Sequence, residues 1–99
     1  MNDEQLKIFI AIAEAGSFSA AEKNSYISKQ AMLKQIKNLE QEIETSLFVR
    51  SRAGIELTPA GKVFLAGSRK LLRQKDELIA KTRVASDSRL IVRIGNVEH

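Results

Sequence analysis

The sequence predicts a mainly α-helical fold in which three helices and a short β-hairpin precede one long helix. Proline and glycine are scarce, at one and five of the 99 residues, so helices can run uninterrupted for many residues. Apolar residues recur three, four or seven positions apart over most of the chain, which indicates amphipathic helices. Just before the single proline they alternate with polar residues, which indicates strands. A chain of this length forms one small domain or a fragment of a larger protein.

The first two helices are expected within residues 1–27. The apolar face of the first helix repeats at helical spacing: Leu6, Phe9, Ile10 and Ala13. Asp3 is its expected N-cap and Gly16 its expected stop. In Ser19-Ala20-Ala21-Glu22, the serine hydroxyl and the glutamate carboxylate can each satisfy a free backbone amide. This capping box is expected to open the second, short helix, which ends near Asn24-Ser25.

A third helix is expected from about Lys29 to Glu44, with Ser28 as its cap. Its apolar face carries Met32, Ile36, Leu39 and Ile43. Its opposite face carries Gln30, Lys34, Lys37 and Gln41. About three residues separate this helix from the second one. Two helices joined so closely form the helix-turn-helix pattern.

A β-hairpin is expected to follow the third helix. Leu47–Arg52 and Ile55–Thr58 can pair around Ala53-Gly54, where glycine supplies the backbone freedom that a tight turn needs. Such a hairpin forms a wing beside the helix-turn-helix, and Arg50 and Arg52 lie near its tip. The predicted fold class is therefore a mainly α winged helix-turn-helix followed by a long helix.

The long helix is expected to start at Thr58-Pro59, because threonine is a good N-cap and proline is tolerated at the first helical position. It is expected to continue to about Ala85. Its apolar residues form a narrow stripe with a seven-residue repeat: Phe64, Leu65, Leu71, Leu72, Leu78 and Ile79. A small domain cannot cover so long a stripe. We therefore expect this helix to dimerise the chain by pairing with the helix of a second copy.

Three segments follow from these elements. Residues 1–58 form the winged helix-turn-helix domain, residues 59–86 the linker or dimerisation helix, and residues 87–99 a hinge and the start of a further domain. Leu90 to Ile94 alternate like a strand but have no evident partner strand in the chain. We therefore expect the sequence to stop inside a longer protein.

The composition argues against several classes of protein. There is no cysteine and the single histidine is His99, so disulfides, metal sites and histidine catalysis are not expected. Glu40, Glu42 and Glu44 alternate along a helix, so they are expected to be solvated and not to converge on one point. An enzyme is therefore not expected. No apolar run approaches the ~20 residues of a membrane span, and no secretory signal follows Met1, so we expect a cytoplasmic chain without membrane contact.

Basic charge increases along the chain. Residues 1–27 contain two basic and four acidic residues, whereas residues 59–99 contain nine basic and four acidic residues. From Lys62 to Lys75 there are five basic residues and no acidic one. A net charge of +4 fits a solvated helix face about as well as a nucleic-acid contact. The charge therefore supports nucleic-acid binding only in combination with the helix-turn-helix.

The third helix and the wing together predict binding to double-stranded DNA. A recognition helix presents polar side chains near its N-terminus to base edges in the major groove. Glutamine can bridge adenine N6 and N7, and lysine can reach guanine O6 or N7. Arginines on a wing suit phosphates or the minor groove. The candidate DNA contacts are Ser28, Lys29, Gln30, Leu33, Lys34, Lys37, Arg50 and Arg52.

Residues 1 to about 85 resemble a known family in both the order and the spacing of several motifs. The motifs are Leu6, Phe9, Gly16-Ser17-Phe18-Ser19, Ile27-Ser28, Gln35-Ile36, Leu39-Glu40, Leu47-Phe48 with Arg50, and Leu57-Thr58-Pro59-Ala60-Gly61. With these motifs the chain resembles the N-terminal region of LysR-type bacterial transcriptional regulators. The sequence departs from the family pattern at Glu22, where an alanine is usual, at Ser25, where a core leucine is usual, and at Leu33, where a serine is frequent. Leu33 would contact a thymine methyl group instead of donating a hydrogen bond.

The resemblance implies a homodimer that binds an imperfect inverted repeat near a promoter, with a tetramer as the alternative in the longer protein. It also implies that a small-molecule effector binds a separate C-terminal domain, so no cofactor is expected in this fragment. Residues 90–95 are similar to the first strand of that domain.

Two other functions stay open on the sequence alone. The chain could be a protein–protein module whose basic face is only solvated and whose long helix is a docking surface. A steep salt dependence of binding to duplex DNA would separate this function from the first one. The chain could also be an architectural DNA-binding protein, which would show no preference between an operator and competitor DNA.

Overall fold

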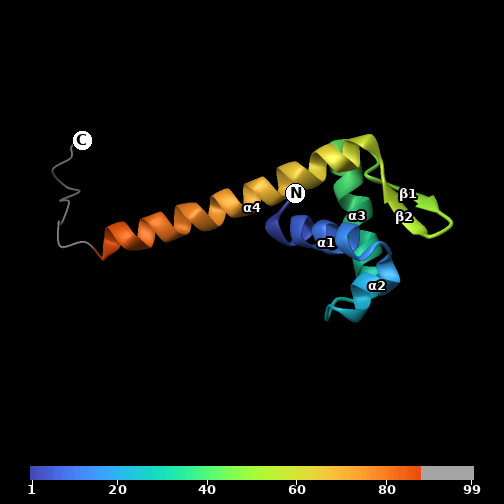
Figure 1. Cartoon of the computed structure of the whole chain (residues 1–99), viewed down its shortest axis with the longest axis horizontal. Helices are drawn as coiled ribbons and strands as arrows, with labels where there is room; N and C mark the ends of the chain where they lie inside the picture. The colour runs from blue at the N-terminus through green and yellow to red at the C-terminus, as the bar shows by residue number, and fades with distance from the viewer. Residues whose placement is uncertain (88–99) are drawn as a thin grey trace.

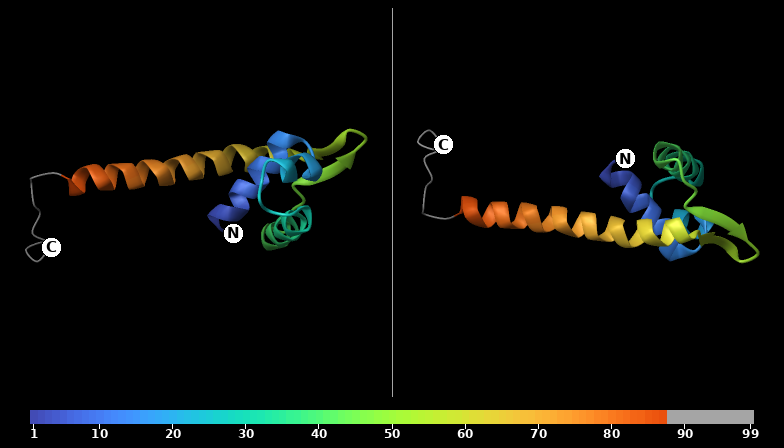
Figure 2. Two further views of the ribbon diagram at one scale, coloured as in Figure 1. Left: turned by 90° about the horizontal axis from the view of Figure 1, so that it is seen from below. Right: turned by 90° about the horizontal axis from the view of Figure 1, so that it is seen from above.

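The computed structural model describes residues 1–87, and the strand predicted at residues 90–94 lies outside this range. The elements are α1 (Asp3–Ala15), α2 (Phe18–Lys23), α3 (Lys29–Ile43), β1 (Phe48–Ser51), β2 (Gly54–Leu57) and α4 (Pro59–Ser86). Helices α1, α2 and α3 and the hairpin gather at one end of α4, which runs away from them as one straight helix (Figure 1). The two further views in Figure 2 show the same projection of α4. We call residues 1–58 the head.

The start of α1 differs from the prediction by one residue. Asn2 is the N-cap, not Asp3, and its side chain accepts a hydrogen bond from the backbone N–H of Gln5 at 2.8 Å. The Gln5 side chain accepts in turn from the backbone N–H of Asn2 at 3.1 Å, so this pair is the capping box. Asp3 lies inside the first turn, where its negative charge favours the positive end of the helix dipole. Gly16 ends α1 as predicted, with φ of 84°.

The predicted capping box at Ser19 is wrong. Helix α2 starts two residues earlier, because the left-handed Gly16 reverses the chain and leaves Ser17 as the first extended residue. The Ser17 hydroxyl accepts from the backbone N–H of Ala20 at 3.0 Å. Glu22 does not reach back to the start of α2; its carboxylate accepts from the backbone N–H of Lys29 in α3. Five residues, 24–28, separate the two helices, where the sequence predicted about three.

The core of the head forms where α1, α3, the hairpin and the start of α4 meet. Its largest fully buried side chains are Phe9, Ile12, Met32, Leu39 and Leu47. The ring centroid of Phe9 lies 5.1 Å from that of Phe48 and 5.2 Å from that of Phe64. Each side chain of this kind contributes about 1.5–3 kcal/mol when it is removed from water. Phe9 therefore joins α1, β1 and α4 in a single core.

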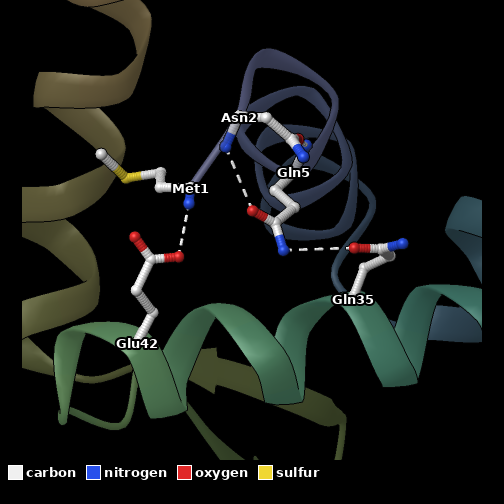
Figure 3. A network of polar contacts seen from close by, with 5 residues as sticks. All are labelled: Met1, Asn2, Gln5, Gln35 and Glu42. Carbon is white, nitrogen blue, oxygen red and sulfur yellow. Dashed lines mark hydrogen bonds and ion pairs between the residues drawn. The ribbon is translucent and has the colours of Figure 1, made fainter.

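Polar contacts fix α3 against α1 beside this core (Figure 3). Gln5 is buried, with 7% of its surface exposed, and its Nε2 donates to Oε1 of Gln35 at 3.2 Å. The amino group of Met1 forms an ion pair with Glu42, which lies nearer the C-terminal end of α3. Because an unpaired buried amide is costly, the Gln5–Gln35 hydrogen bond favours one packing of α3 on α1.

The hairpin forms at the predicted place and is anchored on both sides, but its turn is Arg52-Ala53 and not Ala53-Gly54, because Gly54 pairs with Ser51 as the first residue of β2. Strands β1 and β2 pair antiparallel, with Phe48 opposite Leu57 and Arg50 opposite Ile55. The backbone N–H of Ile55 donates to the carbonyl of Gly16 at 3.3 Å. Gly54 has φ of 136°, and a Cβ at this position would lie 2.7 Å from the same carbonyl oxygen. Glycine is therefore required here both for the turn and for the close approach to the α1–α2 corner.

The expectation that Glu40, Glu42 and Glu44 are all solvated is wrong for Glu40. Its carboxylate is partly buried and accepts from the backbone N–H groups of Leu47 at 2.6 Å and Phe48 at 3.3 Å. Leu47 directly precedes β1 and Phe48 is its first residue, so both amides lie at the start of the strand. Glu40 therefore connects the end of α3 to the start of the wing, whereas Glu42 and Glu44 are exposed.

Helix α4 starts as predicted, and its first half packs on the head. Thr58 is the N-cap and accepts from the backbone N–H of Gly61 at 2.8 Å, with Pro59 in the first turn. A Cβ at position 61 would lie 2.2 Å from the carbonyl oxygen of Leu47, so only glycine permits this approach. Farther along, Arg69 pairs with Glu14 at 2.7 Å. Lys75 pairs with Asp3, and this hydrogen bond and charge raise the pKa of Lys75 above its ordinary value.

Candidate nucleic-acid interface

The face of α3 that points away from the core carries the predicted recognition residues. The helix buries Met32, Ile36 and Leu39 on its other face. Its cap is Ser28, whose hydroxyl accepts from the backbone N–H of Ala31 at 3.1 Å. All six predicted residues of this helix are exposed: Ser28, Lys29, Gln30, Leu33, Lys34 and Lys37. Burial of the opposite face therefore leaves the polar face of α3 free to approach another molecule.

An open groove of about 380 Å³ lies between α3 and the wing. Its lining combines Leu33 and Lys37 from α3 with Val49 and Arg50 from β1. Leu33 is 39% exposed and Val49 is 49% exposed, so the groove has an apolar wall with basic residues beside it. The structure therefore brings the recognition helix and the wing, which are separate in the sequence, to one surface.

A smaller hollow of about 130 Å³ lies next to the groove and is lined by α2, α3 and both strands of the wing. Lys29 from the start of α3 and Arg50 from β1 both line it. Ser17 and Ser19, from the start of α2, line it as well and were not predicted as site residues. The motif Gly16-Ser17-Phe18-Ser19 was the available signal, but nothing in the sequence alone places this corner beside the wing.

The two wing arginines are exposed, but their positions differ. Arg50 lies within β1 opposite Ile55, whereas Arg52 lies in the turn between the strands. Glu56 is opposite Val49 and not opposite Arg50. Within residues 1–87 neither arginine takes part in an ion pair. Arg50 therefore does not pair with Glu56 across the hairpin, and its charge is available to another molecule.

The turn between α2 and α3 explains two departures from the expected pattern. Ala21 is the buried residue of α2. Ser25 does not pack as a core residue; its hydroxyl accepts from the backbone N–H of Ile27 at 3.0 Å and so supports the turn. Ile27 packs against the core in its place. Tyr26 is 97% exposed and points to no partner within the described residues.

The predicted dimerisation stripe on α4 divides into two parts. Phe64 and Leu65 are partly buried because they pack against the core of their own head. Leu72 is also partly buried. The remaining three are exposed, Leu71 by 51%, Leu78 by 65% and Ile79 by 39%. The surface that is open to a partner helix therefore starts near Leu71.

Within residues 1–87, no group of His, Asp or Glu residues is arranged to hold a metal ion. In the same range, no helix has the length and apolar character needed to cross a membrane.

Comparison with known families agrees with this geometry. Residues 4–62 match the model described as bacterial regulatory helix-turn-helix protein, lysR family. The chain belongs to the lysR family. The matched range covers α1 from its second residue, all of α2, α3 and the wing, and ends in the first turn of α4.

Two relatives are named HTH-type transcriptional regulators, which agrees with the expectation that the chain is not an enzyme. The regulator TfdT of Cupriavidus pinatubonensis is 49% identical over 72 residues, which are 73% of this chain and 32% of TfdT. The regulator ClcR of Pseudomonas putida is 41% identical over 86 residues, which are 87% of this chain and 29% of ClcR. The chain thus spans about a third of the length of the curated relatives it matches.

Similar solved structures confirm the predicted winged helix-turn-helix and long helix. The DNA-binding domain of CbnR in complex with DNA superimposes with a TM-score of 0.82 and 40% identity, covering 87% of this chain and 99% of that chain. The BenM domain in complex with benA site 1 DNA superimposes with a TM-score of 0.80 and 34% identity, covering 89% of this chain and 100% of that chain.

Proposed function

We propose that the chain is the sequence-specific DNA-binding domain of a longer lysR-family transcriptional regulator. The main support for this function is that residues from the exposed face of α3 line the same groove as the basic residue Arg50. A major groove admits an α-helix, and a neighbouring wing then lies against the backbone or the minor groove. The DNA complexes of the similar CbnR and BenM domains support this assignment.

The exposed residues would take different parts in that contact. Gln30 and Lys34 lie on the first turns of α3, so we assign them to base edges in the major groove. Leu33, between them on the exposed face, would meet a thymine methyl group. Ser28, Lys29 and Lys37 would contact the backbone. Arg50 and Arg52 would bind phosphates or the minor groove, where arginine responds to groove width.

We also propose that two chains pair through α4. Beyond the head, this helix exposes Leu71 and Leu78, which are seven residues apart, and Ile79, which follows the partly buried Leu72 by seven residues. Replacing Leu71 and Leu78 together with glutamate is expected to give a monomer in analytical ultracentrifugation, while the wild-type chain sediments as a dimer. A wild-type chain that stays monomeric at high concentration would contradict this part. In the longer protein, such dimers would act as they are or assemble into a tetramer.

The organisation of the longer protein follows from the same family membership. We propose that residues 87–99 lead into a separate domain that binds a small-molecule effector, and that residues 1–87 bind no cofactor of their own. The protein would act in the cytoplasm, on an imperfect inverted repeat near a promoter.

Selection of bound sequences from a random duplex library tests the proposed function. The chain is expected to enrich a partial inverted repeat and then to bind it about 10³-fold or more tightly than scrambled DNA. Affinity is expected to decrease steeply as salt is increased. Binding without enrichment would indicate an architectural DNA-binding protein. No salt-dependent binding to any duplex would indicate a protein–protein module.

Substitution of the wing arginines separates the backbone contacts from the base contacts. Arg50→Ala and Arg52→Ala are each expected to weaken binding to the selected duplex and to the scrambled duplex by the same factor. Each lost phosphate contact lowers the slope of log K against log salt by about one. A decrease in melting temperature with an unchanged slope would instead indicate a structural role within the head.

A further inference from the structure

Glu22 makes a contact that neither the family pattern nor the candidate DNA residues include. It lies near the end of α2, and its Oε2 accepts a hydrogen bond from the backbone N–H of Lys29 at 2.8 Å. Lys29 is the first residue of α3. The bond therefore spans the whole α2–α3 turn, residues 24–28, and ends at the tip of the recognition helix.

Phe18, Ala21 and Ile27 hold α2 and the turn against the core, and polar contacts then fix the start of α3. Within α2, Ala21 is the buried residue, and in the turn Ile27 is only partly buried. Two side chains accept hydrogen bonds from backbone N–H groups in the first turn of α3. Glu22 accepts from Lys29, and Ser28 accepts from Ala31. A carboxylate at the N-terminal end of a helix makes a charge-assisted hydrogen bond that the helix dipole strengthens. Glu22 is thus a polar link between α2 and the tip of α3.

The same contact places a negative charge at the end of α3 that carries Lys29 and Gln30. Glu22 is itself exposed, so its charge is not hidden in the head. A phosphate that approaches this end of α3 would meet the carboxylate as a like charge. The contact therefore has two opposite effects on DNA binding: it orients the residues that read bases, and it lowers the attraction of the helix tip for the backbone.

We infer that Glu22 is a positioning residue that increases discrimination between DNA sequences and reduces affinity for all of them. This inference rests on the proposed function, because it assigns Glu22 a part in base reading by α3. Glu22 touches no base itself and acts through the backbone of Lys29.

Two substitutions separate the two effects. Glu22→Gln removes the charge but keeps a side-chain oxygen that can accept from Lys29. It is expected to bind the selected duplex and the scrambled duplex both about two- to fivefold more tightly at low salt, the usual effect of one exposed charge pair. Glu22→Ala removes the charge and the hydrogen bond. It is expected to lower the ratio of specific to non-specific affinity about five- to tenfold, comparable to weakening one base contact.

A DNA-independent measurement and a matched control complete the design. In the free chain, the backbone amide of Lys29 is expected to exchange its hydrogen faster in Glu22→Ala than in the wild type, with Glu22→Gln closer to the wild type. Glu4 is an exposed acid in the first turn of α1, so Glu4→Gln and Glu4→Ala make the same charge changes away from α3. Both Glu4 variants are expected to keep the wild-type discrimination ratio.

The outcomes distinguish this inference from the proposed function. Loss of discrimination in Glu22→Ala, with recovery in Glu22→Gln, would support the inference. Wild-type discrimination in a folded Glu22→Ala chain, or the same loss in both Glu22 variants, would overturn it and leave DNA binding intact. If Glu22→Ala does not fold, a Glu22→Gln chain with unchanged affinity for both duplexes overturns it. A wild-type chain that binds no duplex would overturn the proposed function first, and the inference with it.

Discussion

The two halves of α4 share one continuous helix but lie in different surroundings. The first half packs on the head, where Gly61 and Ser68 are buried and Phe64 contacts Phe9 edge to face. From Arg73 to the end of the helix every residue is exposed. The second half nevertheless carries Leu78 and Ile79, whose apolar side chains find no cover in their own chain within the described residues.

This difference shows that one heptad repeat can serve two kinds of packing. Near the head, the repeat completes an intramolecular core around Phe9. Beyond Leu72 the same spacing continues, and no apolar residue among residues 1–87 covers it, as expected for a helix that meets a second copy. The stability of the head should therefore be insensitive to changes in the apolar residues of the second half of α4, whose contact with the head is the exposed Lys75–Asp3 pair. Dimerisation should be insensitive to many changes in the head.

Truncating one apolar side chain in the head and one in the second half of α4 should produce the largest difference in stability. Phe9→Ala should reduce the free energy of unfolding of the head by about 3–5 kcal/mol, because it removes a fully buried ring from the middle of the core. Leu78→Ala should change it by less than about 0.5 kcal/mol in the dilute chain, because Leu78 is exposed. Denaturant titrations followed by circular dichroism measure both. A comparable loss in Leu78→Ala would show that the second half of α4 packs on the head.

A polar contact of the head should have the next largest effect. Glu40→Ala leaves the backbone N–H groups of Leu47 and Phe48 without their acceptor, so a loss of about 1.5–3 kcal/mol is expected. The matched variant Glu42→Ala removes an acid from the same helix that makes only an exposed ion pair. Its cost should stay below about 1 kcal/mol. Equal effects of the two substitutions in denaturant titrations would argue against the Glu40 link between α3 and the wing.

Two glycines of α4 test where close packing between this helix and the head ends. Gly61→Ala should destabilise the chain by about 1–3 kcal/mol, because the new Cβ would clash with the carbonyl of Leu47. Gly67→Ala meets nothing within 4 Å and should stabilise the helix by about 0.5–1 kcal/mol. Thermal unfolding should therefore move in opposite directions for the two variants. A destabilising Gly67→Ala would mean that close packing extends to the open side of the helix.

The sequence was sufficient to predict most of the fold, because its signals are local. Thr58-Pro59, the alternation around Gly54 and the spacing of Met32, Ile36 and Leu39 each act within a few residues, and each prediction is confirmed. The N-caps at Asp3 and Ser19 were wrong because Asn2 and Ser17 compete with them within two residues, and backbone geometry decides between them.

The site was harder to predict from the sequence, because its contacts join segments that are far apart in the chain. The hollow that joins Ser17 and Ser19 to Arg50 depends on the docking of the wing against Gly16. The bonds from Glu40 to β1 and from Glu22 to α3 span turns, and a helical repeat contains no signal for either. The exposed face of α3 could be predicted, since burial of one helix face determines which residues remain outside.

Base reading by the exposed face of α3 is the central claim, and Gln30→Ala tests it most directly. Affinities of the wild type and the variant should be measured by fluorescence anisotropy on the selected duplex and on a scrambled duplex at the same salt concentration. We predict a loss of about 1–3 kcal/mol on the selected duplex, relaxed preference at one base position and little change on the scrambled duplex. An equal loss on both duplexes would contradict the claim and reduce Gln30 to a backbone contact.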